Sequence, residues 1–166
     1  MKKILRIILI LLLVMNVTAC GEHDQGDETK APATDGFVFE YKGTEIVMHA
    51  DAAPILAALG EPKSYTETAS CAFEGKDKTY FFGSFYLQTY PVGEKDYVYG
   101  VWFADDTVAT GEGLCVGMTR KEVEAAIGTE GFNGSNAFVI TKGASRLTVI
   151  LTDGVVSSIQ YDAVMD

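Results

Sequence analysis

The chain of 166 residues has few of the side chains that enzymes commonly use for catalysis or metal binding. It contains two histidines and three cysteines, and it has no Gly-x-Ser-x-Gly, His-Glu-x-x-His, P-loop or Cys-x-x-Cys motif. Basic residues are also scarce, because 13 Lys and Arg stand against 23 Asp and Glu, for a formal net charge of −10 at pH 7. An acidic surface repels phosphate backbones, which argues against nucleic-acid binding. We therefore expect no enzymatic activity and no cofactor.

One strongly apolar run stands near the start of the chain, at residues 7–15 (IILILLLVM). Basic residues at positions 2, 3 and 6 precede it, and the small residues 17–19 follow it. This order is typical of an export signal. The run is shorter than the stretch of about 20 apolar residues that a membrane-spanning helix needs. The sequence therefore predicts a chain that is exported rather than one that spans the membrane.

The residues VTAC at 17–20 resemble the lipobox of bacterial lipoproteins, in which cleavage leaves the cysteine as the first residue. The resemblance implies a lipoprotein signal peptide at 1–19 and lipid, including palmitate, on Cys20. The alternative is an ordinary secretory signal followed by an incidental cysteine. Residues 20–36 are acidic and offer no large apolar side chain to bury, which predicts a disordered tether. We expect an extracytoplasmic protein that is anchored to the cell membrane through lipid on Cys20.

Two similar segments follow in the part of the chain that is expected to fold. ADAAPILAALGEP at 50–62 and MTRKEVEAAIGTE at 118–130 align at an offset of 68 residues, with matching apolar positions and a matching glycine. Each begins at an N-cap candidate, Asp51 or Thr119, and the second has the form of a capping box. Each ends at a glycine suited to the position after a helix. The pattern predicts two short amphipathic helices.

The residues around the two helices favour strands, because apolar positions alternate there. Lys42-Gly43 and Asp153-Gly154 are typical two-residue hairpin turns. The expected fold is α+β, with two tandem repeats that each pack a short helix on a three-stranded antiparallel sheet, after a leading β-hairpin. The first repeat with its hairpin covers 37–110 and the second covers 111–166. The strands expected after the first helix are at 71–73, 80–90 and 101–103.

The stretch GMTRKEV at 117–123, with IGT at 127–129, resembles the helix motif of the SmpA/OmlA family of small outer-membrane-assembly lipoproteins. The wider fold group includes the beta-lactamase inhibitor protein, which has two tandem helix-plus-sheet repeats. The chain departs from the family where Glu130 replaces its usual proline, although the first copy has Pro62. The first copy also resembles uncharacterised clostridial-type repeat lipoproteins, through the stretches at 59–62, 70–73 and 89–90. The resemblance implies a fold and an anchor, and it carries no function.

Two cysteines, Cys71 and Cys115, remain if Cys20 carries lipid. A pair of cysteines in an exported chain favours a disulfide, which here would join the first repeat to the start of the second. The alternatives are two buried thiols or a reactive thiol. The sequence places no histidine near either cysteine, so it offers nothing to activate a thiol.

Aromatic side chains provide a candidate binding surface in the first repeat. Alternation places Phe85 and Leu87 toward the core and leaves Tyr86, Tyr90 and Trp102 on the outer face of the sheet. Tyrosine and tryptophan are enriched in binding surfaces. The alternative is that the second repeat or the leading hairpin covers these rings as ordinary core.

The residue pattern thus favours a non-enzymatic binding or scaffolding module for an envelope protein, peptide or polymer. One alternative is an envelope-assembly helper or an inhibitor of an extracytoplasmic enzyme. A second alternative is a metal binder or hydrolase that uses carboxylates such as Asp105-Asp106, Glu94, Asp96 and Glu130, or a role for His49 as a base or ligand. Scattered acidic residues on an acidic protein are more often a solvated face, so we expect no metal site.

Overall fold

The structure is a computed structural model that describes residues 35–132 and 135–165. These residues belong to one compact unit, Pro32–Asp166. The predicted signal peptide, Cys20 and the tether up to residue 34 lie outside the described residues. At the end of the predicted tether, the backbone N–H of Ala144 donates to the carbonyl oxygen of Asp35 at 3.0 Å, and Gly36 lies against Ser145.

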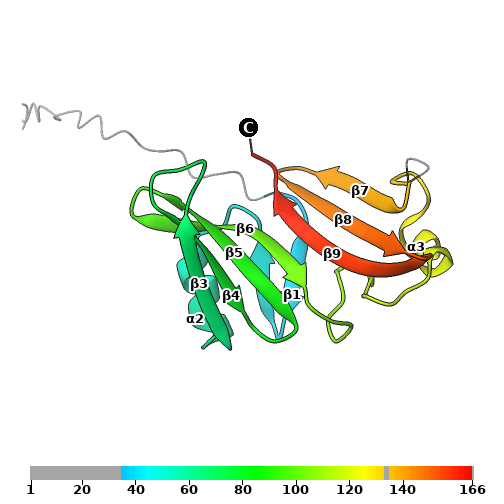
Figure 1. Cartoon of the computed structure of the whole chain (residues 1–166), viewed down its shortest axis with the longest axis horizontal. Coiled ribbons are helices and arrows are strands. Elements are labelled where there is room, and N and C mark those ends of the chain that lie inside the picture. The colour runs from blue at the N-terminus through cyan, green and yellow to red at the C-terminus, as the bar shows by residue number, and fades with distance from the viewer. Residues whose placement is uncertain (1–34, 133–134, 166) are drawn as a thin grey trace, which may run out of the picture. The chain divides into compact units, whose positions relative to one another are not determined.

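Seven strands form one antiparallel sheet in the order β3-β4-β5-β6-β9-β8-β7 (Figure 1). The two central strands, β6 and β9, pair only through Gly100–Trp102 and Gln160–Asp162. The sheet therefore joins two stretches of chain that are far apart in sequence. The strands are β3 Ser64–Ala69, β4 Lys76–Phe81, β5 Phe85–Val92, β6 Lys95–Phe103, β7 Ala137–Lys142, β8 Ser145–Thr152 and β9 Val155–Ala163.

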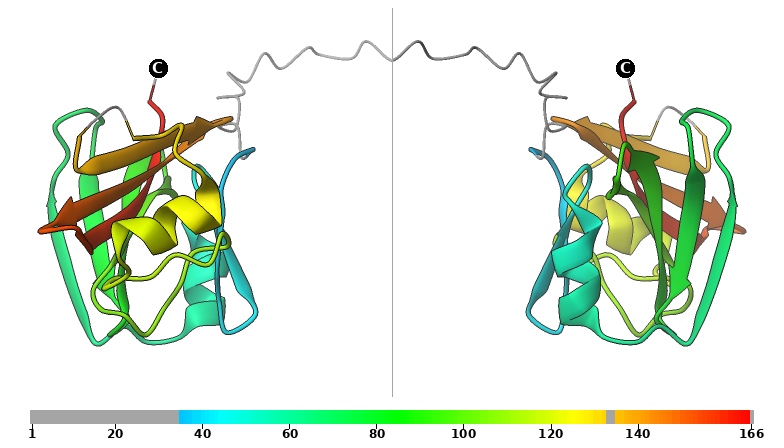
Figure 2. Two further views of the ribbon diagram at one scale, coloured as in Figure 1. Left: turned by 90° about the vertical axis from the view of Figure 1, so that its right-hand side faces the viewer. Right: turned by 90° about the vertical axis from the view of Figure 1, so that its left-hand side faces the viewer.

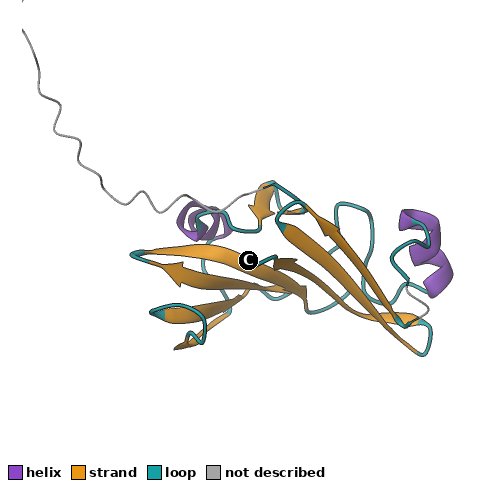
Figure 3. Ribbon diagram, turned by 90° about the horizontal axis from the view of Figure 1, so that it is seen from above, coloured by secondary structure: helices purple, strands orange, loops and turns teal. Residues whose placement is uncertain are grey.

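A separate hairpin and two helices lie on one side of this sheet (Figures 2 and 3). The hairpin consists of β1 (Val38–Tyr41) and β2 (Thr44–Val47), and the helices are α2 (Ala52–Leu59) and α3 (Arg120–Ile127). We call the side of the sheet turned away from these elements the outer face. The leading hairpin and both predicted helices are therefore confirmed.

Local side-chain contacts explain where the helices begin. The Asp51 side chain accepts the N–H of Ala53 at 3.1 Å before α2. Before α3, Thr119 and Glu122 form a reciprocal capping box, in which the N–H of Thr119 donates to Glu122 at 2.7 Å. Each contact satisfies backbone N–H groups that a helix start leaves without partners. The helix boundaries are thus set by the residues that the sequence pattern indicated.

The core lies between the sheet and the elements on its covered side. At its centre the fully buried ring of Phe39 contacts the rings of Phe85 and Phe103, with centroids 5.1 Å away in each case. The buried ring of Tyr161 lies 6.4 Å from that of Phe39. Because Phe39 comes from β1 and the other rings come from β5, β6 and β9, this cluster fastens the hairpin to both halves of the sheet.

A β-bulge at Tyr99 changes the alternation of β6. Gln88 pairs with Gly100 while Thr89 pairs with Val98, so Tyr99 is an extra residue in β6. Simple alternation along β6 would place Tyr97 and Tyr99 on the core side of the strand. Because of the bulge, Val98 lies on that side instead and is fully buried. Gly100 beside the bulge has a steric role, because a Cβ there would lie 2.8 Å from the carbonyl oxygen of Tyr161. Only glycine allows β9 to approach β6 this closely.

The α+β class is confirmed, and the strands expected in the first half need correction. Four strands follow α2 in the sheet, rather than three. The segment 71–73 is part of the β3–β4 connection, and the long strand expected at 80–90 is interrupted at 82–84 into β4 and β5. The first strand after α2 is instead β3, whose six residues SYTETA are all exposed and carry no apolar alternation.

Candidate functional site

Three aromatic side chains cluster on the outer face near the middle of the sheet. Tyr86 of β5 is the direct cross-strand partner of Trp102 in β6 and of Phe81 in β4. The rings of Phe81 and Tyr86 are stacked, with centroids 4.6 Å apart, and Trp102 is 37% exposed. We call Phe81, Tyr86 and Trp102 the aromatic platform. The structure thus brings together two of the three predicted binding residues and adds Phe81, which sequence alternation in β4 could have indicated.

Tyr90, the third predicted residue, also lies on the outer side of β5 but is only 4% exposed. The ring of Phe73 from the β3–β4 connection lies over it, with centroids 5.0 Å apart. Its hydroxyl group is 2.8 Å from Nδ1 of His49. Tyr90 therefore does not belong to the exposed platform, because the loop that follows β3 covers it.

His49 is buried at the edge of β6, next to the place where β9 ends. Its backbone N–H donates to Val98 at 2.8 Å, and its Nε2 is 3.2 Å from the carbonyl oxygen of Val164. Because a carbonyl only accepts, Nε2 carries the hydrogen, and in the neutral ring Nδ1 accepts from the Tyr90 hydroxyl. His49 therefore joins the end of β2 to β5 and to the C-terminal segment, a structural role that the sequence did not reveal.

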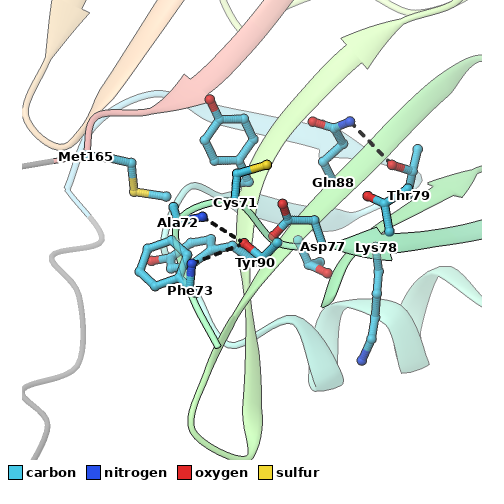
Figure 4. Close-up of a pocket in the computed structure, with 13 residues that line it drawn as sticks. Cys71, Ala72, Phe73, Asp77, Lys78, Thr79, Gln88, Tyr90 and Met165 are labelled. Atoms are coloured by element: carbon cyan, nitrogen blue, oxygen red, sulfur yellow. Dashed lines mark hydrogen bonds between the residues drawn. The ribbon is translucent and has the colours of Figure 1, made fainter. Parts of the chain in front are cut away.

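A hollow of about 390 Å³ adjoins the platform on the outer face (Figure 4). Residues of β3, β4, β5 and β6 line it, and the β3–β4 connection forms a wall. Ser70 shapes this wall, because its Oγ accepts the N–H groups of Ala72 at 3.4 Å and Phe73 at 3.3 Å. The lining residues that matter below are Cys71, Phe73, Asp77, Gln88, Tyr90 and Tyr99.

Cys71 and Cys115 are free thiols, and the predicted disulfide does not join them in the structure. Cys71 is exposed in the β3–β4 connection and lines the hollow, rather than lying on a strand. Cys115 is half-buried before α3, where its backbone N–H donates to Sδ of Met118 at 3.2 Å. The repeat alignment misplaced Cys71, because it did not anticipate β3.

Asp77 is a polar residue of the hollow that was not among the predicted site residues. Its Oδ1 is buried and has no hydrogen-bond partner among the residues that the structure describes. A buried polar atom without a partner is uncommon and costs stability. A run of alternating charges at Lys76–Lys78 was the available signal, but only the strand register shows that Asp77 alone faces outward.

Burial raises the pKa of Tyr90 to about 12 and also raises the pKa of Tyr161, which donates a hydrogen bond to Glu112 at 3.0 Å. Unfolded tyrosine has a pKa of about 10. Above that pH the unfolded chain releases protons that the folded chain keeps, so stability that is fully present below pH 10 is lost as the pH rises. We expect the free energy of unfolding to fall by up to about 1.4 kcal/mol per pH unit for each tyrosine.

Denaturant unfolding at pH 9, 10 and 11 measures this loss. The variant with Tyr90→Phe and Tyr161→Phe should lose less stability over the same range, because neither ring can ionise. An equally steep loss in the variant would show that other groups cause the alkaline destabilisation.

The acidic residues considered for metal binding do not converge on one site among the described residues. Asp96 forms an ion pair with Lys78 on the covered side of the sheet, whereas Asp105 accepts hydrogen bonds from Thr107. Within 35–132 and 135–165, no group of three or more His, Cys, Asp or Glu residues is placed to hold a metal ion.

No helix in the part of the chain that the structure describes is long and apolar enough to cross a membrane. Comparisons of the chain with family models, curated proteins and solved structures find no match to any of them.

Proposed function

We propose that the chain is an extracytoplasmic lipoprotein, anchored to the cell membrane, that binds an envelope protein, peptide or polymer without catalysing a reaction. The anchor is supported by the order of basic, apolar and small residues before Cys20. The binding role rests on one observation, which is the aromatic platform on the outer face, where Trp102 is exposed and Phe81 and Tyr86 are half-buried. An anchored module of this kind holds its partner near the membrane surface.

The platform has the composition of a binding surface. Trp102 and Tyr86 provide large rigid rings that lose little conformational freedom on contact. A polar residue, Gln160, is the partner of Trp102 on β9, and its side chain donates to Asp162 at 2.9 Å. Aromatic anchors bordered by polar groups are the usual arrangement at the centre of an interface. The platform therefore supports recognition of a partner surface.

The proposed architecture includes two tandem repeats, 37–110 and 111–166. The support is that a capped helix precedes an antiparallel run of strands in each half, and that the last strands, β6 and β9, pair at the centre of the sheet. The repeats differ because β3 belongs only to the first. On this view the aromatic platform is a specialisation of the first repeat, since the outer face of the second has Thr148 and Gln160 with the aliphatic residues Val139 and Ile150.

Replacing Tyr86 and Trp102 together with alanine tests the binding role. We expect at least a tenfold loss of cross-linked or co-purified partner from an envelope extract, because each ring has the features of a residue that contributes about 2 kcal/mol to binding. The matched control replaces Tyr65, which is 45% exposed on β3, and Val38, which is 40% exposed on β1, because neither belongs to the outer face near the platform. Unchanged capture by the platform variant, with an unchanged melting temperature, would reject this site.

A further inference from the structure

We propose that the hollow beside the platform binds an alkylammonium group, with Asp77 as its counter-ion and aromatic rings as its walls. This is a second site, distinct from the aromatic platform. It goes beyond the proposed function, and its test needs no partner protein.

The first support is the unpaired oxygen of Asp77. Oδ1 is buried and lacks a hydrogen-bond partner among the described residues, and Asp77 lines the hollow. Figure 4 shows its carboxylate directed into the space between the β3–β4 connection and β5. A carboxylate oxygen only accepts hydrogen bonds, so the group that fits it is a donor, and a charged donor forms the stronger bond.

The second support is that the neighbouring lysines do not reach Asp77. Lys76 and Lys78 flank it in β4 and therefore point to the opposite side of the sheet. Lys76 pairs there with Glu67, and Lys78 pairs with Asp96. Lys78 also borders the hollow, but its ammonium group is paired with Asp96, so neither lysine forms an ion pair with Asp77.

The third support is the lining of the hollow. Phe73 and Tyr90 contribute packed rings, and Tyr99 is placed there by the bulge in β6. Aromatic faces attract ammonium groups, and apolar walls accommodate the carbon chain. Gln88 already donates to Thr79 at 3.3 Å, so its carbonyl oxygen is available as a further acceptor.

The size and charge of the protein fit the same ligand class. The volume of about 390 Å³ lies within the range of roughly 300–1,000 Å³ found for small-ligand sites. The net charge of −10 favours the approach of cations from solution. Anions are disfavoured by the same charge, so an amine or the end of a lysine side chain is the ligand that the chemistry selects.

Titration of the full-length, ¹⁵N-labelled chain in detergent with n-butylammonium tests the site. We expect the amide signals of Ala72 and Phe73, in the wall of the hollow, to shift to saturation, while that of Val123 in α3 stays in place. The neutral isostere 1-butanol should need at least a tenfold higher concentration for the same shift. A second titration uses a lysine amide whose backbone groups are blocked, to distinguish a free amine from a lysine side chain as the ligand. Binding of both amines indicates a lysine within a polypeptide chain. Binding of butylammonium alone indicates a free amine.

The variant Asp77→Asn keeps the size of the side chain and removes its charge. We expect its half-saturating concentration of n-butylammonium to rise at least tenfold. Asp106→Asn is the matched control, since Asp106 is exposed in the segment after β6 and the variant should titrate as the parent does. No shift with n-butylammonium, equal shifts with 1-butanol, or an unchanged titration of Asp77→Asn would overturn the proposal. The comparison of the two ligands on the parent chain stands even if the variant does not fold.

Discussion

Replacing Phe39 with alanine is expected to lower the free energy of unfolding by about 3–5 kcal/mol. The ring is fully buried and contacts Phe85 of β5 and Phe103 of β6. Alanine would remove these contacts and leave a cavity that the surrounding rings cannot fill without moving. Because a small domain has only about 5–15 kcal/mol of stability, the loss is a large part of the total. Urea-induced unfolding followed by circular dichroism measures it.

The neighbouring residue supplies the control for this prediction. Val38 lies next to Phe39 in β1 but is 40% exposed, so Val38→Ala should change stability by no more than about 0.5 kcal/mol. If both variants were equally stable, the hairpin β1–β2 would not be fastened to the sheet by Phe39.

Replacing Cys20 with alanine is expected to abolish lipid attachment completely. The proposed acyl chains are bound to the sulfur of this residue, and alanine has no atom that can carry them. Each buried CH₂ group contributes about 0.8 kcal/mol to membrane binding, so the loss of the acyl chains removes the proposed anchor. Incorporation of labelled palmitate, together with the intact mass of the mature chain, measures the result.

Membrane partition is not a sufficient readout for this variant, because a chain that is not cleaved keeps the apolar run at 7–15. The controls Cys71→Ala and Cys115→Ala retain Cys20 and should incorporate palmitate as the parent does. Labelling of Cys20→Ala at the parental level would show that lipid is attached elsewhere or that the lipobox interpretation is wrong.

The helices and the leading hairpin could be predicted because their boundaries depend on local chemistry. The caps Asp51 and Thr119 form hydrogen bonds within three residues of themselves, and the turn at Lys42-Gly43 needs only positive φ angles, which are 51° and 81°. Such features are encoded in a few adjacent residues. The α+β class followed from these elements together with the alternating strands.

Strand β3 could not be predicted, because it is held by backbone pairing with β4 and not by burial of apolar side chains. Its side chains are all exposed, so the sequence shows no apolar alternation there. Once β3 is missed, the β3–β4 connection is assigned to a strand, and Cys71 and Phe73 are misplaced with it. The position of Tyr90 under Phe73 then appears only in three dimensions.

The candidate site was predictable to the extent that strand alternation governs it. Tyr86 and Trp102 are direct partners in the regular part of the β5–β6 pairing, and the bulge does not separate them. Simple alternation therefore placed both residues correctly on the outer face. Asp77 was not selected, because its significance depends on which neighbours pair with Lys76 and Lys78. Pairing between distant strands is not visible in a local pattern, and this is why the hollow was missed.

The narrow junction between β6 and β9 has a consequence for the order in which the chain folds. The strands on either side of it are joined by short turns, whereas Gly100 and its partner Asp162 are about 60 residues apart in sequence. Closing so long a loop costs more entropy than forming a hairpin, and only three residue pairs compensate for it along this edge. We therefore expect each half of the sheet to form early from its own neighbouring strands, and the pairing of the two at Gly100 to form late.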